Sequence, residues 1–89
     1  MKKTYSQEEF FEIIKKYNSY DRKIITINLS MIYKIIGIKA KDVIADFNYS
    51  SYKVHSWTAL SSPNIPTFED ALALAVKYNF NIEDLIKKI

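Results

Sequence analysis

The chain has 89 residues, 48% of them hydrophobic and 15% aromatic, which is the size and composition of one domain with a packed core. It has one Gly, two Pro and no Cys, so the composition excludes disulfide-stapled folds and thiolate metal sites and disfavours turn-rich β-sandwiches. Thirteen Lys and Arg against ten Asp and Glu give a net charge of +3, a mild bias toward polyanionic partners.

The first predicted helix runs from Ser6 to about Tyr17. Ser6 followed by Glu9 forms a capping box, in which each side chain accepts a hydrogen bond from the other residue's backbone amide. One apolar stripe with helical spacing follows, made of Phe10, Ile13, Ile14 and Tyr17. Residues 18–23 are polar, and we expect a turn there.

Residues 24–38 carry two conflicting patterns. The β-branched run at residues 24–27 is typical of a strand, whereas Leu29, Ile32 and Ile36 keep helical spacing. We prefer a helix from about Leu29 to Ile36. Gly37 ends it, because glycine readily adopts the left-handed conformation that closes many helices.

Two short helices are expected after Gly37. The first runs from Lys39 to about Phe47, buries Val43 and ends at Asn48. The second is capped by Ser50, runs from Ser51 to about Thr58, and buries Val54 and Trp57.

The last third of the chain predicts a loop and two further helices. Residues 61–66 hold both prolines and form the loop. Thr67 with Asp70 opens a helix that Asn79 closes, and its predicted inner face is Phe68, Ala71, Leu72, Ala75 and Val76. Asn81 with Asp84 caps the last helix, with Ile82, Leu85 and Ile86 facing inward.

These elements predict an all-α, compact bundle of five to six helices in a single domain, residues 1–89. Within it, residues 1–23 form an extra N-terminal helix and turn, and residues 29–86 form the core. No apolar run is long enough to cross a bilayer or to serve as a signal peptide, so we expect a cytoplasmic protein without a membrane partner.

The most informative segment is residues 37–57. Two short helices flank a turn there, and Val43 and Val54 each point back at the other helix. This arrangement is the helix-turn-helix unit, whose second helix enters the major groove of DNA. The segment reads GIKAKDVIADFNYSSYKVHSW.

This segment resembles the phage-repressor family, also called the Cro or xenobiotic response element type. The resemblance continues through residues 66–85, with a Pro-Thr start, a Leu-Ala-rich helix and a short capped helix, and it covers about residues 29–86. It implies a lambda-repressor-like fold with an added N-terminal helix. It also implies sequence-specific binding of double-stranded DNA by a transcriptional regulator, typically a repressor of phage or mobile-element type.

The resemblance places base-facing side chains on the second motif helix and phosphate-facing lysines at the start of the first. Lysine donates to guanine O6 and N7, hydroxyls donate or accept, and a tyrosine ring edge contacts a thymine methyl. The predicted DNA-binding residues are Lys39, Lys41, Ser50, Ser51, Tyr52, Lys53, His55 and Ser56. Because one such domain offers few contacts, we expect a homodimer, with Phe11 on the N-terminal helix as a candidate contact.

A second reading remains open, in which the repressor-like fold binds another protein. Ala40 stands where the family often has a phosphate-binding Gln, Ile44 stands where it prefers Ala, and the loop after Trp57 lacks the usual basic segment. Such a module is an antirepressor, an antitoxin or a phage inhibitor of host defence. With one His and no Cys, the sequence predicts neither an enzyme nor a metal or cofactor site.

Overall fold

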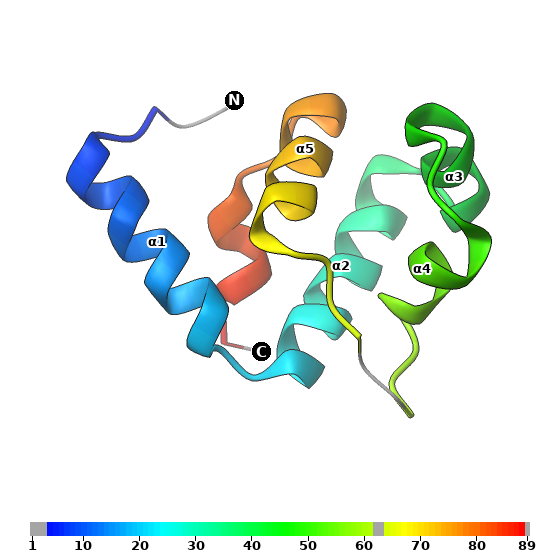
Figure 1. Cartoon of the computed structure of the whole chain (residues 1–89), viewed down its shortest axis with the longest axis horizontal. Coiled ribbons are helices and arrows are strands. Elements are labelled where there is room, and N and C mark those ends of the chain that lie inside the picture. Colours follow the sequence, from blue (N-terminus) through cyan, green and yellow to red (C-terminus); the bar gives the residue numbers. More distant parts are fainter. Residues whose placement is uncertain (1–3, 62–63, 89) are drawn as a thin grey trace.

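The computed structural model describes residues 4–61 and 64–88, and over these residues it is all-helical, without strands. Its elements are α1 (Gln7–Ser19), α2 (Arg22–Ile36), α3 (Ala40–Phe47), α4 (Ser51–Ser56), α5 (Phe68–Tyr78) and the 3₁₀ helix η1 (Ile82–Ile86). In Figure 1, α1 lies at one end of the molecule, α3 and α4 lie at the other, and α2, α5 and η1 lie between them. Of the described residues, none belongs to a helix that is both apolar enough and long enough to span a bilayer.

Several helix ends lie where local chemistry predicts them. The capping box is present, since the Glu9 amide donates to Ser6 Oγ at 3.2 Å and the Ser6 amide donates to Glu9 Oε1 at 3.0 Å. Gly37, Asn48 and Asn79 take left-handed backbone conformations, with φ of 76°, 57° and 57°, and close α2, α3 and α5. These predictions are confirmed.

The helix α2 corrects the prediction for residues 18–38. It begins at Arg22 rather than about Leu29, and α1 continues to Ser19, so the turn between them shortens to residues 20 and 21. Asp21 Oδ1 accepts hydrogen bonds from the amides of residues 23 and 24, at 2.8 and 3.4 Å. This cap, together with the complete burial of Ile25 in the core, outweighs the modest strand preference of the β-branched run.

Two other predictions need correction. Val76, expected on the inner face of α5, is 59% exposed, and Leu74 is fully buried instead. The final element is a 3₁₀ helix, in which the Asp84 amide donates to the backbone carbonyl of Asn81 at 2.9 Å. Its three apolar residues, Ile82, Leu85 and Ile86, are buried as predicted.

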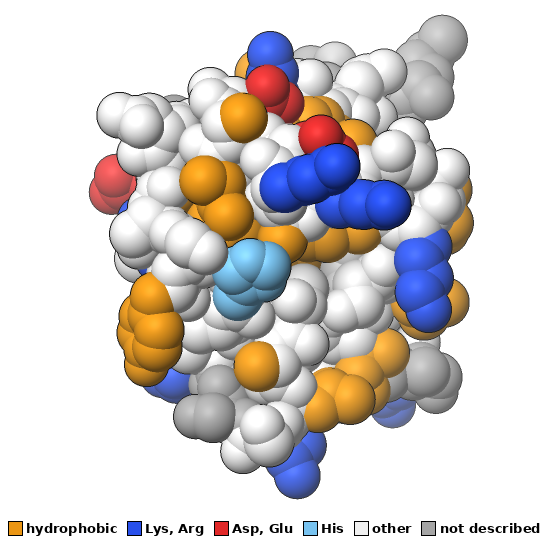
Figure 2. All heavy atoms as spheres, turned by 90° about the vertical axis from the view of Figure 1, so that its right-hand side faces the viewer, with side chains coloured by type: hydrophobic (Ala, Val, Ile, Leu, Met, Phe, Trp, Pro, Cys, Tyr) orange, Lys and Arg blue, Asp and Glu red, His pale blue; other side chains and the backbone are white. Residues whose placement is uncertain are grey.

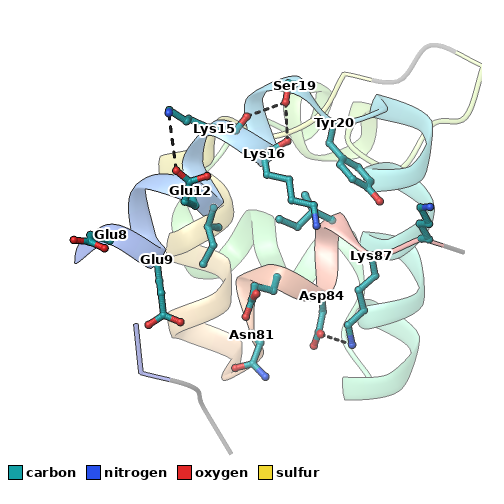
Figure 3. A pocket seen from close by; sticks show the side chains of 14 residues that line it. Glu8, Glu9, Glu12, Lys15, Lys16, Ser19, Tyr20, Asn81, Asp84 and Lys87 are labelled. Carbon is teal, nitrogen blue, oxygen red and sulfur yellow. Dashed lines mark hydrogen bonds and ion pairs between the residues drawn. The ribbon is translucent and has the colours of Figure 1, made fainter. Parts of the chain in front are cut away.

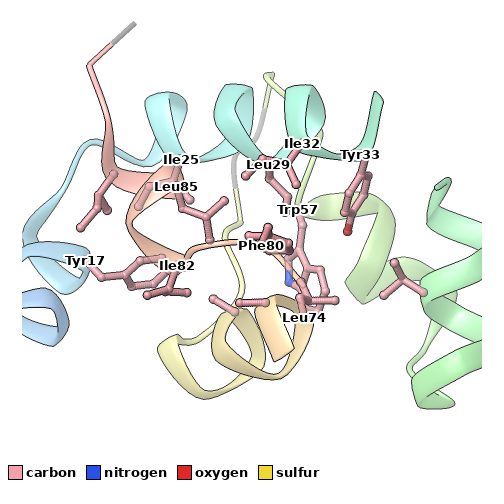
Figure 4. Packing of buried hydrophobic residues seen from close by; sticks show 14 of the residues in the cluster. Tyr17, Ile25, Leu29, Ile32, Tyr33, Trp57, Leu74, Phe80, Ile82 and Leu85 are labelled. Atoms are coloured by element: carbon pink, nitrogen blue, oxygen red, sulfur yellow. The ribbon is translucent and has the colours of Figure 1, made fainter. Parts of the chain in front are cut away.

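One hydrophobic core joins the helices (Figure 4). Ile25 and Leu29 on α2 face Leu85 on η1, Leu74 on α5 and the Trp57 ring that follows α4. All five side chains are at most 2% exposed. Burial of this kind contributes roughly 25 cal/mol for each Å² of apolar surface removed from water.

The helix α1 belongs to the same core. Tyr17 is 1% exposed, and its hydroxyl donates to the Pro66 carbonyl at 2.7 Å. The Phe68 ring at the start of α5 packs edge-on against both Tyr17 and Phe10, with centroids 5.5 and 5.6 Å apart. These contacts fix α1 against the first turn of α5.

A buried amide fastens η1 to α2. Asn28 is 9% exposed, and its Nδ2 donates to the carbonyls of Leu85 and Lys87 at 2.9 and 3.0 Å. The last carbonyls of a helix have no partner within the helix. Asn28 therefore donates hydrogen bonds to two carbonyl oxygens at the end of η1 that packing against α2 shields from water.

Candidate nucleic-acid interface

The helices α3 and α4 pack on each other across a turn of residues 48–50. Asn48 reverses the chain in its left-handed conformation, and Ser50 Oγ accepts from the Lys53 amide at 3.2 Å to start α4. Val43 on α3 and Val54 on α4 are both fully buried. The structure therefore has the helix, turn and helix that the sequence predicts, with the predicted residues at the turn and in the contact.

The outer edge of α4 is open to solvent. Ser51, Tyr52 and His55 are exposed, and Tyr52 is the most accessible of the large hydrophobic side chains described, at 82%. Val54 and Trp57, on the opposite side, hold the helix to the core. The exposed edge is therefore fixed in place by core packing on its other side, as a binding site for another molecule requires.

Lys53 takes a different position from the one predicted for a base-reading residue. Its Nζ lies 3.1 Å from Oδ2 of Asp70 on α5, and its side chain is 42% exposed. The same ammonium group lies 4.3 Å from the centroid of the Tyr49 ring and 5.8 Å from that of Trp57. In this structure Lys53 therefore connects α4 to α5.

The two remaining predicted hydroxyls on α4 serve the backbone. Ser50 is the helix cap, and Ser56 Oγ donates to the Lys53 carbonyl at 2.7 Å. A hydroxyl that donates to a carbonyl keeps its lone pairs, so Ser56 retains only an accepting role toward a ligand. Because Ser56 is also half-buried, a ligand has limited access to its hydroxyl oxygen.

Lys39 and Lys41 lie exposed at the beginning of α3. The Lys39 amide donates to Asp42 Oδ2 at 2.8 Å, so a carboxylate already occupies the positive end of this helix. The two lysines therefore offer flexible ammonium groups for a phosphate rather than a ready-made backbone anion site.

An aromatic cluster sets the position of α3 and α4 against α5. The Phe47 and Tyr49 rings stack with an interplanar angle of 7° and centroids 5.1 Å apart, while Trp57 and Tyr78 pack edge-on against them. Because Phe47 covers Tyr49 and the Lys53 ammonium lies over the same ring, Tyr49 is not a free stacking platform for a base.

Two tyrosine hydroxyls of this cluster bind carboxylates. Tyr49 donates to Asp70 Oδ1 at 3.0 Å, and Tyr78 donates to Asp46 Oδ2 at 2.6 Å. Burial first, and these hydrogen bonds second, raise the pKa of both tyrosines. Sequence reasoning missed Asp70 and Asp46 as partners, because residues separated by 21 and 32 positions meet only in the folded chain.

The charge of this face is sparse. Between residues 38 and 62 the chain has Lys39, Lys41 and Lys53 against Asp42 and Asp46, and Lys53 is paired with Asp70. Figure 2 shows the end of the molecule that carries α3 and α4: lysine side chains stand among hydrophobic and uncharged ones rather than in one continuous patch.

A depression lies between α1 and η1, away from α4 (Figure 3). Both signs of charge line it, and part of that charge is paired locally: Lys15 lies 4.0 Å from Glu12, and Lys87 lies 2.8 Å from Asp84. Its mixed and exposed lining does not indicate one class of ligand. Over residues 4–61 and 64–88, no three His, Asp or Glu side chains gather in a way that would hold a metal ion.

Comparison of the sequence with family models finds no match, and comparisons with curated proteins and with solved structures find none either. A functional assignment therefore rests on the two short helices α3 and α4 and on the exposed edge of α4.

Proposed function

We propose that this protein binds double-stranded DNA in the cytoplasm as a repressor-type transcriptional regulator of lambda-repressor-like fold, with α4 as its recognition helix. The observation that carries the proposal is the exposed edge of α4, formed by Ser51, Tyr52 and His55 on a helix that Val54 and Trp57 anchor from behind. A major groove about 12 Å wide admits such a helix end.

The exposed side chains of α4 suit base edges better than phosphates. The Tyr52 ring edge suits a thymine methyl, and the hydroxyls of Tyr52 and Ser51 suit purine N7 or thymine O4. Lys39 and Lys41, at the start of α3, supply the phosphate contacts that set the register on the duplex. In this arrangement Lys53 supports α4 and contributes less to base reading.

One helix of six residues reads few base pairs, so the proposal includes a homodimer on a two-fold symmetric operator. Half-sites one helical turn apart lie about 34 Å from each other. The exposed Phe11 of α1 remains a proposed dimer contact, at 55% exposure.

The test is retention on DNA as a function of salt. Full-length protein is mixed with random-sequence and bacterial genomic fragments, and bound fragments are selected and sequenced at rising salt. We expect selection of a short symmetric site and an affinity that falls steeply with salt as counterions are released. Tyr52→Ala should relax the selected sequence, whereas Val76→Ala, at an exposed position of α5, should not.

The pairing of Lys53 with Asp70 and the sparse charge around α4 favour a second candidate, a protein-interaction module. An exposed tyrosine on a rigid helix is a common anchor in protein interfaces. The same experiment separates the two functions, because a protein-only module shows no retention on DNA even at low salt.

A further inference from the structure

A stripe of apolar side chains covers the outer side of α2. Ile24, Ile27, Met31 and Ile35 follow each other at intervals of three or four residues, so they lie on one side of the helix. Ile25, Leu29 and Ile32 fill the core side of the same helix. The sequence therefore makes α2 apolar on two separate faces, and the core uses only one of them.

The stripe is accessible. Met31 is 50% exposed and Ile35 is 78% exposed, while Ile24 and Ile27 are half-buried. Single exposed apolar residues are common on protein surfaces, but a contiguous row of them on one helix marks an interaction site. With a rise of about 1.5 Å per residue, the row is roughly 16 Å long, which suits a partner helix of about three turns.

The charge beside the stripe is basic. Helix α2 carries Arg22, Lys23 and Lys34 and no acidic residue, and helical spacing places Lys23 and Lys34 along one edge of the stripe. Lys88 follows η1, whose end Asn28 holds against α2. Asp21 accepts hydrogen bonds from the amides that begin α2, and Asp84 pairs with Lys87.

This charge argues against a second copy of the chain as the occupant. In a two-fold antiparallel pairing of two α2 helices, the lysine edges of both copies lie on the same side, with Lys23 of one beside Lys34 of the other. Like charges placed side by side weaken such a contact. A partner with acidic residues beside its own apolar row makes favourable contacts along the whole stripe.

We propose that the outer face of α2 docks an amphipathic helix of another protein, one with an aliphatic stripe and acidic flanks. The surface is separate from α4, and the proposal does not depend on DNA binding. Met31 and Ile35 are its anchors, and Lys23 and Lys34 select the sign of the partner's charge.

The experiment uses the full chain and two designed helical peptides of about 18 residues. Both have leucines at helical spacing, flanked by Glu in one peptide and by Lys in the other. Binding is followed by backbone amide shifts in nuclear magnetic resonance and by fluorescence anisotropy. We expect the acidic peptide to bind, to shift the amides of α2, and to bind much more tightly than the basic peptide.

The variants test the named residues. Met31→Lys and Ile35→Lys should each weaken binding by about tenfold or more, as loss of a buried aliphatic anchor implies. Lys34→Glu should lower the affinity for the acidic peptide and raise the affinity for the basic peptide. Val76→Lys, at an apolar position on α5 whose exposure lies between those of Met31 and Ile35, is the matched control and should change neither affinity. Thermal melts check that each variant remains folded.

Four outcomes overturn the proposal. These are equal binding of both peptides, no binding of the acidic peptide, affinity that is insensitive to Met31→Lys and Ile35→Lys, and shifts that map outside α2. Two further measurements identify another occupant. Self-association in sedimentation that Ile35→Lys abolishes points to a second copy. Binding to phosphatidylglycerol vesicles that Ile35→Lys abolishes, without peptide binding, points to an anionic membrane surface.

Discussion

Lys53 on α4 and Asp70 on α5 form an ion pair, with Nζ and Oδ2 3.1 Å apart, that joins the exposed helix α4 to α5. The other carboxylate oxygen of Asp70 accepts from the Tyr49 hydroxyl at 3.0 Å, and the Lys53 ammonium lies over the Tyr49 ring. Three side chains from three segments thus stabilise one position of α4. This relationship leads to two predictions.

The first prediction concerns stability. A partly exposed ion pair contributes about 0.2 to 1 kcal/mol, so a double-mutant cycle with Lys53→Met and Asp70→Asn should give a coupling free energy of that size. Asp70→Ala should cost more, about 1 to 2 kcal/mol, because it also removes the acceptor of the Tyr49 hydroxyl. Urea unfolding at neutral pH measures each value. A coupling of zero would show that the pair does not hold α4.

The second prediction concerns DNA and rests on the proposed function. Asp70→Asn keeps the shape of the side chain but releases Lys53 from its counter-charge, so affinity for DNA should rise. The slope of log affinity against log salt should steepen by about one unit, as one additional phosphate contact implies.

The control for this second prediction is the double variant Asp70→Asn with Lys53→Met. It should not show the increase in affinity for DNA. If Asp70→Asn binds DNA no better than the original protein, Lys53 does not reach the duplex when it is released. If no variant binds DNA at any salt concentration, the proposed function itself fails.

A third prediction concerns Asn28. Asn28→Ala should lower the free energy of unfolding by about 2 to 3 kcal/mol, because it leaves two partly buried carbonyls at the end of η1 without donors. Denaturant unfolding measures the loss. Asn18→Ala, at an exposed position near the end of α1, is the matched control and should stay within about 0.5 kcal/mol. An equal effect at the two positions would contradict the role of Asn28.

A fourth prediction concerns alkaline pH. Burial raises the pKa of Tyr33 from 10.0 to about 12, because its environment favours the neutral phenol. Because the unfolded chain loses the Tyr33 proton first, the free energy of unfolding is unaffected by Tyr33 below about pH 10. It falls as the pH rises toward the pKa of the folded state, by roughly 1 kcal/mol at about pH 11. Urea midpoints measured from neutral to alkaline pH should show this loss.

Tyr33→Phe is the control for the fourth prediction. Among the residues that the structure describes, the buried Tyr33 hydroxyl has no hydrogen-bond partner, so its removal should leave stability at neutral pH unchanged or slightly higher. The variant should also lose less stability than the original protein between about pH 10 and 12. An identical alkaline loss in both proteins would show that Tyr33 does not carry the effect.

Local chemistry in the sequence determined much of this structure. Ser6 with Glu9, Ser50, Gly37 and Asn48 mark helix ends that a few neighbouring residues specify, because caps and left-handed residues satisfy backbone groups close by. The short helix, the turn and the second helix at residues 40–56 follow from such signals. Helical spacing in the sequence likewise predicts that Val43 and Val54 are buried, as they are in the structure.

Only the tertiary structure decided what depends on distant partners. The strand-like run at residues 24–27 became part of α2 because Ile25 is buried in the core, and Val76 turned outward because Leu74 faces that core instead. The resemblance assigned Lys53 to the base-facing side of α4, but in the structure its ammonium group lies beside Asp70 on α5. Caps and periodicity act over a few residues, whereas burial and ion pairing depend on which surfaces the folded chain brings together, and a local pattern does not contain that information.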